Sequence, residues 1–290
     1  MANLISGTRA LMKRYDIRPV KSLGQNFLVD TNIVNNISAL PELGPDDTVC
    51  EIGSGFGSLT AELSARAGRV IAIEKDSRMI PALMEALTAS GAIDNVEVVC
   101  ADFLDYDLGL LPAGCKLVGN LPYRVTTPIL MKAVDSPDIP PVMVFMMQRE
   151  VAERICASPG GKDYGAVSVA IQYRYKAEYA MDVSREVFMP RPNVDSAVVV
   201  LKSAPERCGT PKDEALFFAV IKAGFGQRRK MLRNALSSLA PNAGALEAAF
   251  TRAGVKGTAR AETLSVDDFI ALSDALAEVR SAGRIVGQAI

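Results

Sequence analysis

The feature that most limits how this chain can fold is a regular alternation of short apolar strands with helical stretches in its first half. The expected strands are Thr48–Ile52, Arg69–Glu74, Val96–Cys100, Lys116–Gly119 and Val142–Met147. Stretches with helical periodicity separate them, such as residues 58–67 and 78–90. Strands joined by helical crossovers pair in parallel. The sequence therefore predicts an α/β fold with a doubly wound, Rossmann-like sheet.

The second half of the chain changes in character. Two further strands, expected at about residues 166–179 and 194–202, lie close in sequence and can complete a seven-stranded sheet as an antiparallel pair. Beyond residue 205 only helices are expected, at about residues 213–224, 229–239, 244–253 and 265–280. We therefore expect one domain over residues 1–205 and a small all-α domain over residues 206–290.

Composition excludes several classes of site. The chain has no histidine, which removes the commonest general base at neutral pH and the commonest ligand of catalytic zinc. Its five cysteines form no C-x-x-C pair, so we expect free thiols and no metal. A net charge of −1 argues against a surface that binds nucleic acid everywhere, although a local basic face remains possible. No secretion signal or long apolar stretch is seen, and we expect a cytoplasmic protein without membrane contact.

A glycine-rich turn follows the first of these strands. Gly53, Gly55 and Gly57 allow a tight turn and close approach of a ligand, and Glu74 ends the next strand, where it can accept hydrogen bonds from ribose hydroxyls. The spacing is Gly-x-Gly-x-Gly, which differs from the pyrophosphate-binding pattern Gly-x-Gly-x-x-Gly. Because S-adenosylmethionine carries no phosphate, the turn favours S-adenosylmethionine over NAD as the cofactor.

Asp102 follows the third strand and can accept a hydrogen bond from the amino group of the adenine, with Phe103 beside the ring. Taken alone, Asp102 could equally cap a turn. Glu51, the glycine turn, Glu74 and Asp102 nevertheless stand at successive strand ends, which favours a cofactor site.

The fourth strand runs into Asn120, Leu121, Pro122 and Tyr123. The Asn120 side-chain carbonyl and the Leu121 backbone carbonyl can accept the two N–H groups of an amine on a flat base, and Pro122 restricts the turn. Such acceptors stabilise the positive charge that grows on an adenine N6 during methyl transfer, so no strong base is needed. The absence of histidine then fits the chemistry.

Two aromatic residues are candidate platforms for the target base. Tyr123 can stack on an extruded base, or it can be an ordinary core tyrosine. Phe188 stands in a proline-flanked loop, where it can present its ring to a base or act as a hydrophobic plug.

These residues resemble one known family, the ribosomal RNA adenine N6-dimethyltransferases, and within it the small-subunit (16S) branch linked to kasugamycin sensitivity. The similarity covers nearly the whole chain. The motifs that carry it are Gly24–Leu28, Glu51–Gly55, Asn120–Tyr123, Gln148–Ala152, Lys162–Gly165, Phe188–Pro192, Val194–Ala197 and Phe225–Asn234. The chain departs from the family at Ser54, where proline is usual, and we expect an effect on cofactor affinity only.

The resemblance implies a class I S-adenosylmethionine-dependent methyltransferase fold, with residues 1–205 as the catalytic domain. It implies cofactor contacts at Asn26, Leu28, Gly53, Glu74, Asp102 and Asn120. It also implies dimethylation of two adjacent adenines in a hairpin near the 3′ end of small-subunit rRNA, within an assembling 30S-type particle. We expect the enzyme to act as a monomer.

Basic residues cluster in the expected helical domain. Lys222, Arg228, Arg229, Lys230 and Arg233 lie in a stretch from Leu216 to Ala235 that contains no acidic residue. Helical spacing would place Arg229 and Arg233 on one face. We interpret the cluster as an RNA-binding surface, while a solvated helix face or an interdomain ion pair remains open for each residue.

Three other functions are weighed. A large-subunit rRNA methyltransferase of the macrolide-resistance type resembles the same cofactor and Asn-Pro-Tyr motifs, but the loop around residues 162–165 and the helical tail favour the small-subunit enzyme. A non-catalytic RNA-binding assembly factor is disfavoured by the intact Asn120, Tyr123 and Glu74. A nicotinamide-dependent oxidoreductase is disfavoured by the glycine spacing.

Overall fold

The computed structural model describes residues 4–20, 24–136, 138–204, 209–227 and 230–287. Its strands are β1 (Phe27–Leu28), β2 (Thr48–Ile52), β3 (Arg69–Glu74), β4 (Val96–Cys100), β5 (Lys116–Asn120), β6 (Val142–Gln148), β7 (Tyr175–Val183), β8 (Phe188–Met189) and β9 (Ser196–Ser203). Its helices are α1 (Leu4–Arg14), α2 (Thr31–Ala39), α3 (Ser58–Ser64), α4 (Ile80–Ser90), α5 (Thr126–Val134), α6 (Arg149–Cys156), α7 (Ala166–Arg174), α8 (Glu214–Gly226), α9 (Leu232–Ala235), α10 (Ala243–Ala253) and α11 (Val266–Gly287). Among these helices none is both long and apolar enough to cross a membrane.

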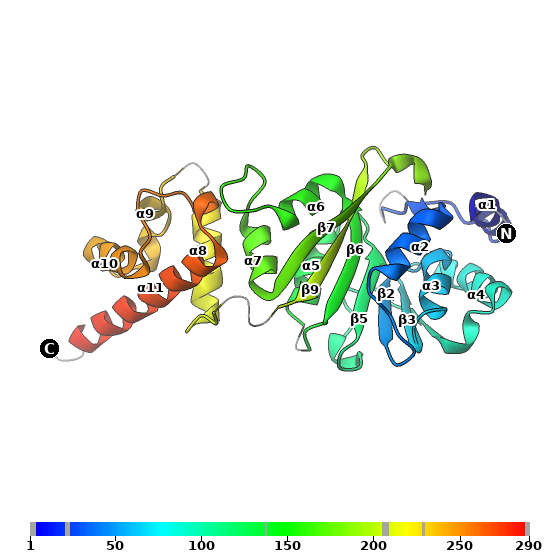
Figure 1. Cartoon of the computed structure of the whole chain (residues 1–290), viewed down its shortest axis with the longest axis horizontal. Helices are drawn as coiled ribbons and strands as arrows, with labels where there is room; N and C mark the ends of the chain where they lie inside the picture. The colour runs from blue at the N-terminus through cyan, green and yellow to red at the C-terminus, as the bar shows by residue number, and fades with distance from the viewer. Residues whose placement is uncertain (1–3, 21–23, 137, 205–208, 228–229, 288–290) are drawn as a thin grey trace. The chain divides into compact units, whose positions relative to one another are not determined.

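A seven-stranded sheet forms the centre of the first unit, in the order β4-β3-β2-β5-β6-β9-β7. The strands from β4 to β6 pair in parallel, and β9 runs antiparallel to β6. Figure 1 shows β3, β2, β5 and β6 side by side in this order. The predicted α/β fold with a seven-stranded sheet is confirmed.

The register of the parallel strands places their carboxyl ends together. Ile52 at the end of β2 stands opposite Ile73 of β3 and Gly119 of β5. Alternate residues such as Val49, Val70 and Val118 are fully buried in one apolar cluster of this unit. Burial on both faces explains why these strands read as nearly continuous apolar runs.

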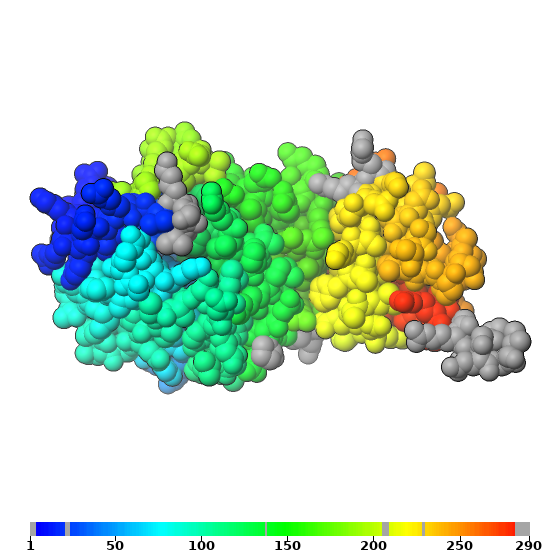
Figure 2. Space-filling view, turned by 180° about the vertical axis from the view of Figure 1, so that it is seen from behind, coloured from blue at the N-terminus to red at the C-terminus, as the bar shows by residue number. Residues whose placement is uncertain are grey.

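The N-terminal helix α1 lies against α4. The Tyr15 hydroxyl donates to the Glu85 carboxylate over 2.7 Å, and Leu11 and Met12 pack on the cluster around the buried Met79. In Figure 2 the blue N-terminal segment rests directly on the cyan surface that includes α4. A second, two-stranded antiparallel sheet pairs β1 with β8.

One predicted strand is wrong. The sequence suggested a strand over residues 166–179, but residues 166–174 form the helix α7, and β7 begins only at Tyr175. The Gly165 N–H donates to the Ser168 hydroxyl over 3.0 Å, which satisfies a free donor at the start of the helix. Apolar β-branched residues within this helix therefore mimic a strand pattern.

The chain divides into two compact units, Met1–Ala152 with Ala177–Ser203, and Glu153–Lys176 with Ala204–Ile290. Residues 153–176 thus belong to the same unit as the C-terminal helices, whereas the sequence placed a single boundary after residue 205. The assignment of catalysis to residues 1–205 and of RNA binding to residues 206–290 stays a prediction. Within the predicted helix over 229–239, α9 covers only Leu232–Ala235; Lys230 lies in a bend before it, and Ser237–Leu239 form a short 3-10 helix after it.

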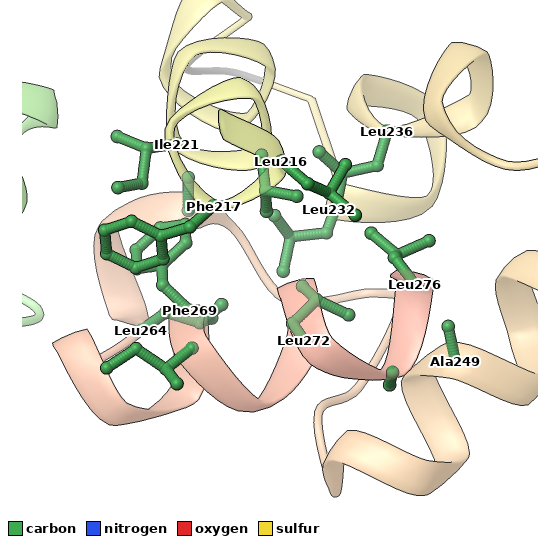
Figure 3. Close-up of a cluster of buried hydrophobic side chains, with 14 of the residues drawn as sticks. Leu216, Phe217, Ile221, Leu232, Leu236, Ala249, Leu264, Phe269, Leu272 and Leu276 are labelled. Carbon is green, nitrogen blue, oxygen red and sulfur yellow. The ribbon is translucent and has the colours of Figure 1, made fainter. Parts of the chain in front are cut away.

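The helical unit has its own apolar core. Phe217 of α8, Leu232 of α9, Ala249 of α10 and Phe269 of α11 belong to one buried cluster. Figure 3 shows their side chains converging between the helices. The Phe269 and Phe225 rings lie 5.8 Å apart between centroids. The helical unit therefore depends on interlocked aromatic and leucine side chains.

We expect Phe269→Ala to lower the free energy of unfolding by about 3 to 5 kcal/mol, because Phe269 is 0% exposed and its removal leaves a cavity. Met231→Ala is the control, since Met231 is 45% exposed and its loss should cost less than about 0.5 kcal/mol. Urea unfolding followed by far-ultraviolet circular dichroism measures both, as the chain has no tryptophan. Equal losses in the two variants would contradict this description of the core.

Candidate active site

A cavity of about 160 Å³ opens at the carboxyl ends of the parallel strands. It is lined by residues at or just after the ends of β2, β3, β4 and β5, by the segment that leads into β1, and by one residue of α5. These residues are Gly24–Phe27, Ile52, Gly53, Gly55, Ile73–Lys75, Ala101–Leu104, Asn120–Val125 and Ile129. Strand ends of an open α/β sheet are the usual place for a ligand. Five of the six predicted cofactor residues, Asn26, Gly53, Glu74, Asp102 and Asn120, meet here, and the predicted target-site residues Leu121, Pro122 and Tyr123 line the same cavity.

The glycine turn approaches the cavity with its backbone. Gly53 and Gly55 have φ values of 78° and 57°, a left-handed conformation that favours glycine, and both line the cavity. The Ser54 hydroxyl contacts the Ile73 carbonyl at 3.4 Å, and the Ser54 N–H donates to the same oxygen. The unusual serine therefore ties the turn to β3.

Glu74 is held in place by the backbone. Its carboxylate accepts from the N–H of Gly55 over 2.9 Å and from the N–H of Asp76 over 2.8 Å. Burial raises the pKa of Glu74, and these two donors oppose that rise. One bond goes to each oxygen, so each keeps capacity to accept from a ligand hydroxyl.

Asp102 has two partners at the cavity wall. It forms an ion pair with the ammonium of Lys75, and it accepts from the Leu104 N–H over 3.0 Å. Partial burial opposes ionisation, but Lys75 and the Leu104 N–H together outweigh it, and the pKa of Asp102 lies below its usual value. Asp102 does cap a turn, as the alternative interpretation held, and it also lines the cavity.

The orientation of Asn120 is fixed by a contact distant in sequence. Its side-chain Nδ2 donates to the backbone carbonyl of Asn26 over 2.9 Å. Only the amide nitrogen can donate to a carbonyl, so Oδ1 is the atom left to accept. The backbone N–H of Leu121 donates to the backbone carbonyl of Met146 over 2.9 Å, and this hydrogen bond anchors the turn to β6.

Tyr123 lines the cavity and is partly buried. Its hydroxyl forms a 2.7 Å hydrogen bond with the hydroxyl of Ser196, which is fully buried at the start of β9. Burial raises the pKa of Tyr123, so the phenol keeps its proton at neutral pH. The ring is thus tethered at its far end.

Two predicted site residues lie elsewhere. Leu28 and Phe188 stand opposite each other in the β1–β8 pair and belong to the core cluster, with 8% and 4% exposure. Neither lines the cavity. This placement of Phe188 is the one expected of a hydrophobic plug.

Several lining residues were missed by sequence reasoning. Phe27, the first residue of β1, packs edge-on against Phe56 with ring centroids 4.7 Å apart. Lys75 directly follows Glu74, and Arg124 directly follows Tyr123. Their position next to predicted site residues was the only signal in the sequence that could have identified them. Within the described ranges no three cysteine or acidic side chains converge as a metal would require.

The predicted basic cluster is described in part. Lys222, Lys230 and Arg233 are exposed, and Arg233 lies 3.7 Å from a Glu247 carboxylate oxygen. Arg228 and Arg229 lie outside the described residues. The expected common face of Arg229 and Arg233 therefore stays a prediction.

Glu51 is a buried acid beneath the glycine turn. It is 2% exposed, it does not line the cavity, and it accepts a hydrogen bond from the Thr60 hydroxyl. Burial raises the pKa of Glu51 from 4.5 to about 7.

The sequence is similar to a known protein family along most of its length. The family model described as "Ribosomal RNA adenine dimethylase" matches residues 18–278. "Ribosomal RNA small subunit methyltransferase A" of Lactiplantibacillus plantarum is 48% identical over 280 residues, covering 93% of this chain and 94% of the relative. The protein of the same name from Moorella thermoacetica is 45% identical, covering 93% and 96%.

Two solved structures share the fold. The 23S rRNA methyltransferase ErmE is 30% identical with a TM-score of 0.68, covering 87% of this chain and 100% of its own. A dimethyladenosine transferase from Plasmodium falciparum has a TM-score of 0.76 at 24% identity, covering 89% and 98%.

We expect Glu51→Gln to remove a pH dependence of stability. The folded state holds a proton on Glu51 that the unfolded chain releases above its ordinary pKa of 4.5, so wild-type stability falls between about pH 4.5 and 7 and levels off above. The neutral glutamine does not titrate. The variant should therefore gain about 3 kcal/mol relative to wild type across this window.

Urea unfolding at pH 5 and pH 8 measures this difference. A difference between the two proteins that is the same at both pH values would show that Glu51 does not titrate between them.

Proposed function

This chain belongs to the ribosomal RNA adenine dimethylase family, and from that premise we propose how its cavity works and on what it acts. It is an S-adenosylmethionine-dependent enzyme that dimethylates adenine in small-subunit rRNA. The proposed targets are two adjacent adenines in a hairpin near the 3′ end of that RNA. The observation that carries the proposal is the Asn120–Asn26 hydrogen bond, which leaves an amide oxygen as acceptor within the cavity.

The lining residues suit the methyl donor. Glu74 would accept from the ribose hydroxyls, and Asp102 from the adenine amino group, while Gly53 allows the donor to approach the backbone. Asn26 contributes by holding Asn120, and the predicted contact of Leu28 would have to be made through its backbone, since its side chain is in the core. S-adenosylmethionine supplies a methyl group activated by a positively charged sulfur.

Asn120 and Leu121 would position the target amine. The lone pair of an adenine N6 is delocalised into the ring, and acceptors on both N–H groups favour the pyramidal nitrogen that attacks a methyl group. Oxygens fixed before the reaction stabilise the growing positive charge without reorganising. Both are carbonyl oxygens, so the arrangement works without histidine.

Tyr123 would stack on the target base. A base must leave its RNA stack to reach the cavity, and an aromatic ring replaces part of the lost stacking energy. The Ser196 hydrogen bond restricts rotation of the Tyr123 ring, which lowers the entropy lost when the base binds. Phe188 remains a proposed second platform, although its position is that of a core residue.

The proposed partner is rRNA within an assembling 30S-type particle, bound by a monomer in the cytoplasm. The exposed Lys222, Lys230 and Arg233, together with Arg228 and Arg229, would bind RNA phosphates through the helical unit. The 48% identity to a small-subunit methyltransferase, against 30% to ErmE, favours the small subunit over the macrolide-resistance type. The ordered acceptors of the cavity argue against a non-catalytic assembly factor.

We expect the wild type to form N6,N6-dimethyladenine in unmethylated small-subunit particles and none in large-subunit particles. Asn120→Ala should lower kcat by about 100- to 1,000-fold, because an acceptor for the transition state is lost. Its affinity for S-adenosylmethionine should fall as well, since the resemblance places Asn120 at the cofactor. Mass spectrometry of digested rRNA and calorimetry with the donor measure these effects.

Full dimethylation by Asn120→Ala would refute its role as acceptor. Unchanged donor affinity with lost turnover would confine Asn120 to the target side. Dimethyladenine in large-subunit rRNA alone would overturn the choice of substrate.

The RNA-binding proposal predicts that reversing Lys222 and Lys230 to Glu weakens binding to small-subunit particles at least tenfold at low salt, with less effect at high salt. Arg280→Glu is the control, because Arg280 is also exposed in the same unit, on α11, and is not one of the cluster residues. Sedimentation with purified particles measures the affinity. Equal affinity of the double variant and the control for the particles would show that this cluster does not contact RNA.

A further inference from the structure

One charged side chain at the cavity has no role in the site described above. Arg124 directly follows Tyr123, lines the cavity and is exposed, whereas the neighbouring Leu121 is fully buried. Val125 also lines the cavity, and α5 begins one residue later at Thr126. An exposed lining residue stands at the rim, so the Arg124 guanidinium is at the mouth of the cavity.

The other charges at the cavity already have partners. Lys75 forms its ion pair with Asp102, and Glu74 accepts two backbone N–H groups. Arg124 has no ion pair or side-chain hydrogen bond with any residue in the described part of the chain. The first turn of α5 contains no acidic residue. The rim thus carries a positive charge that no described neighbour neutralises.

We propose that Arg124 binds a phosphate of the RNA backbone next to the target adenosine, and thereby fixes the nucleotide as its base enters the cavity. This inference rests on the function proposed above. A base that enters a pocket remains joined through its sugar to two phosphates, which stay in solvent at the mouth. The planar guanidinium can donate two parallel hydrogen bonds to one phosphate.

A second anion must be distinguished from the phosphate. The carboxylate of S-adenosylmethionine is also available to a guanidinium. The exposure of Arg124 favours the phosphate, because the proposed donor contacts Glu74 and Asp102 would hold the donor within the cavity, whereas the RNA backbone would remain outside. Arg124 on this view orients the RNA and takes no part in methyl transfer, as phosphate contacts generally set register.

The test compares Arg124→Ala, Arg124→Lys and the control Arg66→Ala. Arg66 is an exposed arginine that follows α3, near the start of β3 and therefore at the opposite edge of the sheet. Purified unmethylated small-subunit particles are the substrate, and kcat and KM are measured at several salt concentrations. Calorimetry gives the donor affinity of each variant and verifies that it is folded.

For Arg124→Ala we expect the KM for particles to rise about tenfold, as for one charge-assisted contact, with kcat and donor affinity within twofold of wild type. The slope of log KM against log salt should fall by about one. Arg124→Lys should recover part of the loss, because it restores the charge but not the paired donors. Arg66→Ala should behave as wild type.

An unchanged KM and salt slope in Arg124→Ala would overturn the proposal. Weakened donor binding with an unchanged KM for particles would assign Arg124 to the donor carboxylate and equally overturn it. Failure of the wild type to methylate the particles is a different result, since it would refute the proposed function itself.

Discussion

The parallel register of β3, β2 and β5 is the constraint on which the rest of the structure depends. Ile52 pairs with Ile73 on one side and with Gly119 on the other, so the three strands end at the same level. The residues that follow them therefore share one edge of the sheet, and the cavity opens there. A shift of the register would separate these residues, even though each local motif could still form.

Hydrogen bonds then fix the polar side chains before any ligand arrives. Glu74 is held by two backbone N–H groups, Asp102 by Lys75 and Leu104, and Asn120 by the carbonyl of Asn26. An enzyme that stabilises a developing charge gains most from groups that need not move during the reaction. In the proposed mechanism this ordering would help to accelerate methyl transfer, and it would do so without a general base.

The segment from Asn120 to Arg124 brings three kinds of contact into five residues. Asn120 offers an acceptor, Tyr123 offers a ring tethered to Ser196, and Arg124 places a charge at the rim. A proline within the segment limits the conformations available to its neighbours. Recognition of amine, base and RNA backbone can therefore be joined in one short stretch at the end of β5.

The α/β fold, the glycine turn and the position of Glu74, Asp102 and Asn120 at strand ends could be predicted from the sequence, because they follow from local periodicity and turn chemistry. Tertiary structure decided what depends on partners distant in the chain. The Asn26 carbonyl accepts a hydrogen bond from Asn120, and the Ser196 hydroxyl is hydrogen-bonded to Tyr123. Phe188 lies in the core, where it pairs with Leu28. Residues 166–174 became a helix although their apolar pattern also suits a strand. Ser168 also donates to the carbonyl of Arg154, and such a contact cannot be read from local sequence.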